Sequence, residues 1–209
     1  MDQEEPQIPA IPWTTFEDID WDLVTRNHYL QAEECLRRFA AEQNGDPAYG
    51  LILQVGQNWH LHAHLNTVSA KNEIATRMRD VANWAGGMTD EELLARTGWW
   101  YPPTWKYEHL EHQCGEPCRA ADDFNYECFE RIHSELSDPL NFDRAHELRT
   151  ASDNARTKAA EQILSSPVLA GILKTPDFQA FIVDDDGLIP HTHEHPGDVA
   201  ARRAVGEQA

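Results

Sequence analysis

Hydrophobic residues recur at three- and four-residue steps over residues 21–43, which predicts one face of an amphipathic helix. This face carries Val24, His28, Ala32, Cys35, Leu36 and Phe39. Asn44, Gly45 and Pro47 follow directly, and residues of these types end helices. We therefore expect a helix from residue 21 to about residue 43.

Residues 49–68 show a different period, because hydrophobic side chains occupy every second position of 49–55 and of 59–65. Period two on both sides of the junction Gly56-Gln57-Asn58 is typical of a β-hairpin. A helix through the same residues would hold Gly50 and Gly56 in its interior, at roughly 1 kcal/mol each relative to alanine. We predict the hairpin and keep a long helix as the alternative.

The remaining pattern is mostly helical. We expect helices over residues 69–84, 89–96, 105–113, 119–136 and 142–164, and short helical or extended pieces over 167–173 and 177–183. Thr89 and Glu92 have the spacing of a capping box at the start of the second of these helices. The predicted fold class is α+β, a helix-rich single domain with a small antiparallel β-hairpin. An all-α bundle is the alternative if residues 49–68 are helical.

A chain of 209 residues is long enough to bury a substantial core, so one domain is expected. Pro6, Pro9 and Pro12 predict an extended N-terminal arm over residues 1–20. The helix-rich globular domain then covers 21–183, and 184–209 form a polar C-terminal tail that contains histidines.

The net charge of −19 restricts the classes of partner. Such a charge repels phosphate backbones and anionic lipids, so we expect no direct binding to nucleic acid and none to membranes. The chain has neither a run of about 18 apolar residues nor a secretory leader, which predicts a cytoplasmic protein. A basic protein is the partner that this charge suits. The oligomeric state stays open.

The segment His60-Leu-His62-Ala-His64 is the main chemical motif. Alternate side chains of a strand share one face, which would root these imidazoles about 7 Å apart along the chain. Neutral imidazole is a common ligand of zinc, copper and iron, so His60, His62 and His64 are candidate metal ligands. The alternative is a set of solvated residues on the outer face of the strand.

A second cluster has the atom types of a structural zinc site. Its members are His109, His112, Cys114, Cys118, Cys128 and His133. A gap of three residues between Cys114 and Cys118 is irregular for zinc, and a redox pair of these two is one alternative. A buried, inert Cys128 on an apolar helix face with Phe124 is another.

The run from Gly56 to Leu65 resembles the active-site strand of histidine-triad nucleotide hydrolases, over about forty residues in all. This resemblance implies that His62 is the nucleophile and that His60 and His64 assist it. The spacing from Gln57 to His60 is one residue shorter than in that family.

The same strand also resembles the His-hydrophobic-His strand of rolling-circle endonucleases. That resemblance implies that His60 and His62 bind a metal and that a tyrosine, Tyr101 or Tyr107, is the nucleophile. Those enzymes act on DNA, which a net charge of −19 disfavours.

The leading functional hypothesis is a divalent-metal protein that uses zinc, with iron as the second choice. It could hydrolyse a phosphate or ester bond, with His62 and the base Glu111 as the catalytic residues. The alternative is a non-catalytic acidic interaction protein, viral or regulatory, that binds a basic partner or imitates nucleic acid. The sequence leaves open whether the protein is an enzyme.

Overall fold

The computed structural model describes residues 19–55, 60–71, 73–81, 86–97, 105–107, 110, 115–136, 142–184 and 187–188. The N-terminal arm before residue 19 and the tail after residue 188 therefore lie outside the described residues. None of the helices among the described residues is both long and apolar enough to cross a membrane.

Helix α1, Trp21–Glu42, confirms the first predicted helix. The side chain of Asp20 caps its start by accepting a hydrogen bond from the amide of Leu23 at 2.9 Å. After α1, the backbone turns through Asn44 and Gly45, which have φ angles of 49° and 80°. These left-handed angles suit asparagine and glycine and direct the chain into the sheet.

The predicted hairpin is also confirmed. Strands β1, Ala48–Gln54, and β2, His62–Thr67, pair antiparallel, with Leu53 opposite Ala63 and Leu51 opposite Leu65. The long-helix alternative for this segment, and with it the all-α bundle, is therefore wrong. Period-two alternation outweighed helix propensity because each strand buries side chains on both of its faces.

The sheet contains a strand that the sequence pattern did not identify as one. Strand β3, Lys174–Asp184, lies parallel to β1 on the side away from β2, and the short β4, Gly187–Leu188, pairs with the end of β3. The strand order is β2-β1-β3-β4. Pairing β3 with β1 joins segments more than 100 residues apart in the chain, and no local period reports such a contact.

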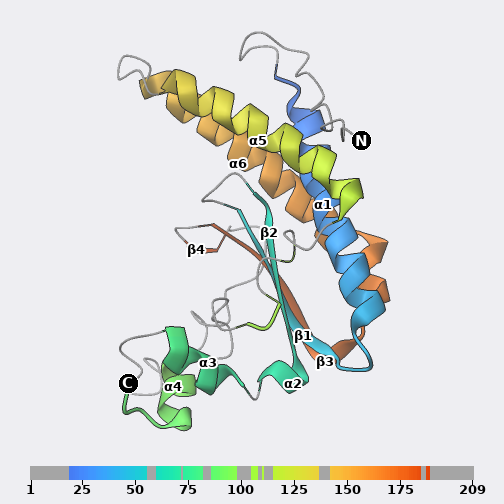
Figure 1. Cartoon of the computed structure of the whole chain (residues 1–209), viewed down its shortest axis with the longest axis vertical. Helices are drawn as coiled ribbons and strands as arrows, with labels where there is room; N and C mark the ends of the chain where they lie inside the picture. Colours follow the sequence, from blue (N-terminus) through green and yellow to red (C-terminus); the bar gives the residue numbers. More distant parts are fainter. Residues whose placement is uncertain are drawn as a thin grey trace, which may run out of the picture.

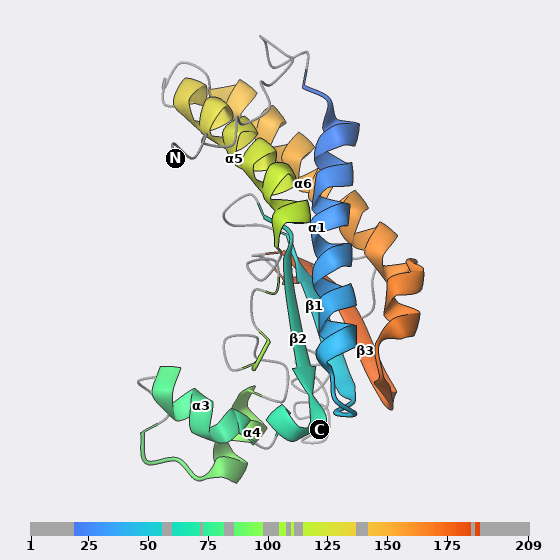
Figure 2. The same ribbon diagram turned by 45° about the vertical axis from the view of Figure 1, so that its right-hand side comes forward.

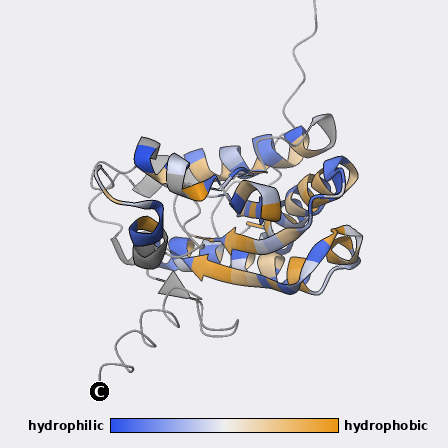
Figure 3. Ribbon diagram, turned by 90° about the horizontal axis from the view of Figure 1, so that it is seen from below, coloured by the Kyte–Doolittle hydropathy of each residue, from blue (hydrophilic) through white to orange (hydrophobic). Residues whose placement is uncertain are grey.

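Helices α1 and α6, Phe142–Leu164, pack against one face of the sheet (Figures 1 and 2). The main core lies between them, with Leu36 of α1, Leu51 and Leu53 of β1, Leu65 of β2 and Ile163 of α6 all fully buried. Seen from below, the strands are the most hydrophobic part of the molecule and the helices carry more of the polar residues (Figure 3). The sheet therefore supplies most of the apolar surface of this core.

The opposite face of the sheet meets a second apolar cluster, formed with α3, Ile74–Val81, and α4, Asp90–Thr97. Tyr49 and Ile52 of β1 contribute to it, together with Ile74, Met78 and Leu93. The predicted capping box at the start of α4 is confirmed, because Glu92 accepts from Thr89 N–H at 2.7 Å and Thr89 Oγ1 accepts from Glu92 N–H at 3.2 Å.

Two local predictions were wrong. The helix expected over 69–84 is two pieces among its described residues, α2, Val68–Lys71, and α3. The helix expected over 105–113 does not form at residues 105–107, because Tyr107 forms a β-bridge with Leu65. The Leu65 amide donates to the Tyr107 carbonyl at 2.9 Å, so pairing of the outer edge of β2 replaced the helix.

Helix α5, Glu116–Leu136, packs on α1 and α6 (Figure 2). A small apolar cluster, named here the α5 cluster, lies between these three helices. Its buried members are Ile19, Val24, Phe124, Cys128, Leu148 and Ala155.

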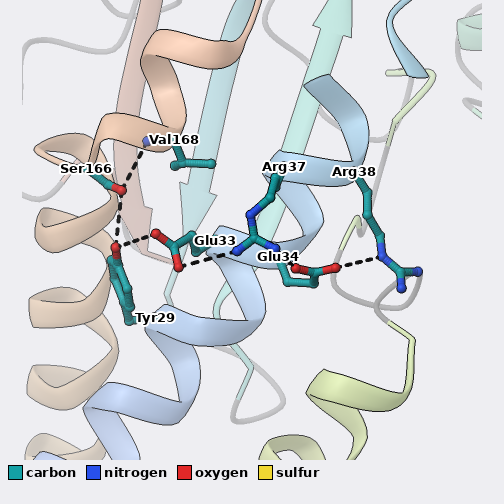
Figure 4. Close-up of polar contacts among 7 residues, drawn as sticks. All are labelled: Tyr29, Glu33, Glu34, Arg37, Arg38, Ser166 and Val168. Carbon is teal, nitrogen blue, oxygen red and sulfur yellow. Dashed lines mark hydrogen bonds and ion pairs between the residues drawn. The ribbon is translucent and has the colours of Figure 1, made fainter. Parts of the chain in front are cut away.

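A line of polar contacts joins α1 to the short helix η7, Pro167–Gly171, which follows α6 (Figure 4). The Tyr29 hydroxyl donates to Glu33 at 2.7 Å, so its oxygen accepts from the Ser166 hydroxyl at 3.2 Å. Ser166 Oγ in turn accepts from the Val168 amide at 3.2 Å and caps η7. Arg37 forms an ion pair with Glu33, the residue that accepts from Tyr29.

Changing Tyr29 to Phe removes only the hydroxyl at the centre of this line. We expect the free energy of unfolding to fall by about 1 kcal/mol, since a typical intramolecular hydrogen bond contributes about that much. Urea unfolding followed by circular dichroism measures it. Tyr126→Phe is the control, because the Tyr126 hydroxyl is exposed and bonds Glu130 on its own helix, so its removal should cost less. An equal loss in both variants would contradict the structural role of Tyr29.

Candidate functional site

The histidines of the main motif form a row at the start of β2. The ring centroids of His60 and His62 are 5.8 Å apart, and those of His62 and His64 are 6.1 Å apart. His62 and His64 lie opposite Gln54 and Ile52 of β1, which places them on the sheet face that α3 and α4 cover lower down. The prediction of a shared face is therefore confirmed for His62 and His64, whose side chains are buried instead of solvated, while His60 is partly exposed.

Two histidines of this row contact polar side chains of β1 and α5. His64 Nε2 lies 3.2 Å from Gln54 Oε1, across the hairpin. His60 Nδ1 lies 3.4 Å from Asp122 Oδ1 on α5, and the same carboxylate oxygen accepts from Gln31 Nε2 on α1 at 2.9 Å. The row therefore connects the end of the sheet to both helices.

His28 of α1 is the most deeply buried imidazole next to this row. Its Nδ1 lies 3.2 Å from the side-chain amide of Asn125 on α5, and the two groups form a buried hydrogen bond. Burial first, then the charges of Arg156, His60 and His62, lower the pKa of His28 from 6.5 to about 3. His28 is thus neutral at physiological pH, since desolvation and nearby cations both oppose protonation.

Helices α1, α5 and α6 and the segment just before β2 meet at these contacts in what we call the polar junction. Its members are His28, Gln31, His60, Asp122, Asn125 and Arg156. Arg156 is 2% exposed and pairs with Asp153 on the same helix. Asn125 is 4% exposed, and its Oδ1 atom has no hydrogen-bond partner among the described residues. Buried polar groups depend on such partners, so the junction tolerates few changes of charge.

The junction is not arranged as a metal centre in the part of the chain that the structure describes. No three His, Cys, Asp or Glu side chains there are placed to hold one metal ion. The zinc, iron and ligand roles of His60, His62 and His64 stay predictions from the sequence.

The second predicted zinc cluster is only partly described. His109, Glu111, His112 and Cys114 lie outside the described residues, and His133 belongs to α5 without a described side chain. The tail histidines and Tyr101 also fall outside.

The two described cysteines of that cluster are in different chemical states. Cys118 is disulfide-bonded, and a disulfide sulfur is not the thiolate that zinc binds. Cys128 is a free, buried thiol in the α5 cluster beside Phe124, as its core alternative describes. The core alternative fits Cys128, whereas the redox pair of Cys114 and Cys118 stays a prediction because Cys114 lies outside the described residues.

Sequence reasoning did not identify most of the polar junction. His28 was grouped with the apolar face of its helix, and Gln31, Asp122, Asn125 and Arg156 carried no motif. A usable signal was present, because His28, Gln31 and Cys35 share one helix face at steps of three and four residues. Polar residues on an otherwise buried face indicate partners on another element.

Comparisons of the chain with models of known protein families, with curated proteins and with solved structures found no match.

The depressed pKa of His28 makes the stability of the fold depend on pH. Below pH 6.5 the unfolded chain binds a proton at His28 that the folded chain excludes until about pH 3, so stability falls as pH falls through this window. By linkage we expect a loss of about 2 kcal/mol between pH 8 and pH 5. Urea unfolding at both pH values measures it.

His28→Gln should remove this part of the pH dependence, because glutamine does not titrate. His146→Gln is the control, since His146 is exposed on α6, and it should keep the wild-type dependence. Carboxylates whose pKa is lowered, such as Asp46, lose their contribution only at lower pH, below about 4. An unchanged difference between pH 8 and pH 5 in His28→Gln would contradict the assignment.

Proposed function

We propose that this chain is a non-catalytic acidic binding protein whose negative surface engages a basic protein partner. The observation that carries the proposal is a net charge of −19 in a fold that binds several of its described cations to its own carboxylates. A surface of this kind attracts a positively charged partner and repels a negatively charged one.

Several ion pairs within the chain support this view. Arg37 and Arg38 both bind Glu34 on α1, as Figure 4 shows. Further pairs are Arg77 with Glu73, Arg79 with Asp90, and Lys158 with Asp22. In each pair a carboxylate lies next to the cation. These cations therefore do little to screen the unpaired carboxylates on the rest of the surface.

Exposed carboxylates are spread over different helices. Glu91 lies on α4, and Glu147 and Glu161 lie at opposite ends of α6. Charges in these positions steer a basic partner toward the molecule and speed its association, an effect that salt screens.

Catalysis has weaker support among the described residues. Of the histidines that suggested an enzyme, His62 and His64 are buried, and His60 and His64 already contact Asp122 and Gln54. A described pocket between α1 and Tyr107 has a volume of about 120 Å³, whereas small-molecule sites usually have about 300–1,000 Å³. Cys35, Arg38, Phe39, Glu42, Tyr107 and Leu110 line it.

The partner class that fits best is a protein whose own function requires a basic surface, such as a nucleic-acid-binding protein. Clustered lysines and arginines on such proteins are placed to bind phosphate, and carboxylates can occupy the same surface. Double-stranded DNA should then compete with this chain for the partner.

Affinity capture from a lysate of the source cells, followed by a NaCl gradient and mass spectrometry, tests the proposal. We expect one basic protein in stoichiometric amount. Its Kd, measured by calorimetry, should rise about tenfold or more between 50 and 300 mM NaCl, as for steered complexes of opposite charge.

The triple variant Glu91→Gln, Glu147→Gln, Glu161→Gln should bind the partner more weakly than the wild type does. Its Kd should also depend less on the salt concentration. A matched variant with three exposed uncharged residues changed, Gln162→Ala, Ser165→Ala and Gln179→Ala, should bind like the wild type. Salt-independent binding, or captured proteins with no excess of basic members, would overturn the proposal.

Elemental analysis separates this proposal from the metal hypothesis. Near-stoichiometric zinc or iron in the purified protein, lost in His62→Ala, would favour the metal protein over the acidic binding protein.

A further inference from the structure

The pocket between α1 and Tyr107 has an apolar end and a charged end. Three of its lining residues, Cys35, Phe39 and Glu42, follow at steps of four and three on α1 and so share one face of the helix. The helical rise places Cys35 and Glu42 about 10 Å apart along this face. Cys35 and Phe39 are buried, as is Leu110 from another segment of the lining. Glu42, in contrast, is exposed.

The charged end of the pocket favours a cation. The Glu42 carboxylate forms no hydrogen bond or ion pair with another residue in the part of the chain that the structure describes. Glu42 is also the last residue of α1, whose last turn holds no basic residue. Because the C-terminal end of a helix carries a partial negative charge, a cation beside it is stabilised. A positive group at this end would interact with the carboxylate and with the helix end.

Arg38 lines the same pocket, but its guanidinium is already engaged. Its Nε lies 3.0 Å from Glu34 Oε1, one turn earlier on α1 (Figure 4). The guanidinium also lies against the backbone of Gly115, where an added side-chain carbon would be 2.6 Å from Arg38 Nη2. Glu34 therefore balances the charge of Arg38 on the side away from Glu42, and the pocket keeps its preference for a cation.

Two aromatic rings form part of the lining. Phe39 and Tyr107 meet edge to face, with ring centroids 4.8 Å apart. Aromatic faces attract cations, and the exposed ammonium group of Lys106 lies 5.4 Å from the centroid of the Tyr107 ring. Lys106 itself is not among the lining residues. These rings suit both an alkyl chain and a nearby ammonium group.

The volume of the pocket, about 120 Å³, limits the size of the ligand. An apolar cavity of about 150 Å³ binds benzene, which has six heavy atoms, so the same density gives about five heavy atoms here. A primary amine with a chain of four carbons has this size. Its chain would fill the apolar end, and its ammonium group would stay at the charged end.

We propose that this pocket is a binding site for a short primary alkylamine, with n-butylammonium as the ligand of matching size. The alkyl chain contacts Cys35, Phe39 and Leu110, and the ammonium group binds Glu42 and the end of α1. A diamine of the same length would place its second ammonium group at the apolar end, where burial without a partner is costly. The site therefore selects monoamines. It needs no protein partner, so it goes beyond the proposed binding of a basic protein.

Titrations of the intact chain with n-butylammonium at pH 7 test the proposal. Leucine methyl groups are labelled with ¹³C, and the Leu110 signal is identified as the one missing in Leu110→Met. We expect a saturable shift of this signal with a Kd of about 1–10 mM, typical of so small a ligand. 1-Butanol, the neutral compound of the same size, should bind about tenfold more weakly. 1,4-Diaminobutane and butanoate should bind more weakly still.

Glu42→Gln should separate the two ends of the site. In this variant the Kd of n-butylammonium should rise about fivefold, while that of 1-butanol stays unchanged. Glu161→Gln is the matched control, because Glu161 is an exposed carboxylate on α6, and it should bind both compounds like the wild type. Cys35→Leu, which fills the apolar end, should weaken both compounds to the same extent.

Three results would overturn the proposal. These are the absence of a saturable shift up to about 100 mM n-butylammonium, equal affinities for the amine and the alcohol in the wild type, and tighter binding of butanoate than of the amine. The last result would assign the pocket to an anion held by Arg38. None of these outcomes bears on the salt-dependent capture of a basic protein, so the two proposals can fail separately.

Discussion

Strand β1 has hydrogen-bonded neighbours on both sides and packed side chains on both faces. Leu51, Ile52 and Leu53 are fully buried, so every backbone polar group of this stretch needs a partner within the protein. The antiparallel β2 and the parallel β3 supply these partners. Because side chains alternate along β1, its pairing also decides which residues face α1 and α6 and which face α3 and α4. The two apolar clusters on the sheet follow from this one strand.

Where α5 packs on α1 and α6, polar contacts accompany the apolar ones. The α5 cluster is small, and the same three helices share a buried arginine, a neutral histidine and two amides beside it. Apolar contacts are not directional, whereas hydrogen bonds fix how two helices are turned relative to each other. The junction therefore orients α5 at the cost of making its attachment sensitive to charge. The charge of the buried Arg156 is balanced by Asp153 on its own helix.

On the surface, by contrast, the charges are not balanced. There the chain carries many more carboxylates than cations, and the described cations are often bound to neighbouring acids. A protein that needs only solubility does not require so large an imbalance, because a net charge of about 2–8 suffices for a small domain. This excess is the physical reason for preferring a binding function over the chemistry that the histidine motif first suggested.

The sequence by itself determined the local elements of this protein. Period and capping residues placed α1, the hairpin, the capping box of α4 and helix α6 at or close to their observed bounds, because each depends on residues a few positions apart. The shared face of His62 and His64 also followed from strand geometry alone.

Only the tertiary structure decided the contacts between distant segments. The parallel pairing of β3, the bridge of Tyr107 to Leu65, and the meeting of His28 with Asn125 each join residues at least 40 positions apart. No hydrophobic period encodes which segments will meet, and a polar side chain shows its partner only once two elements are packed together. For the same reason, the histidine motif could be found in the sequence, while its burial beside a polar junction could not.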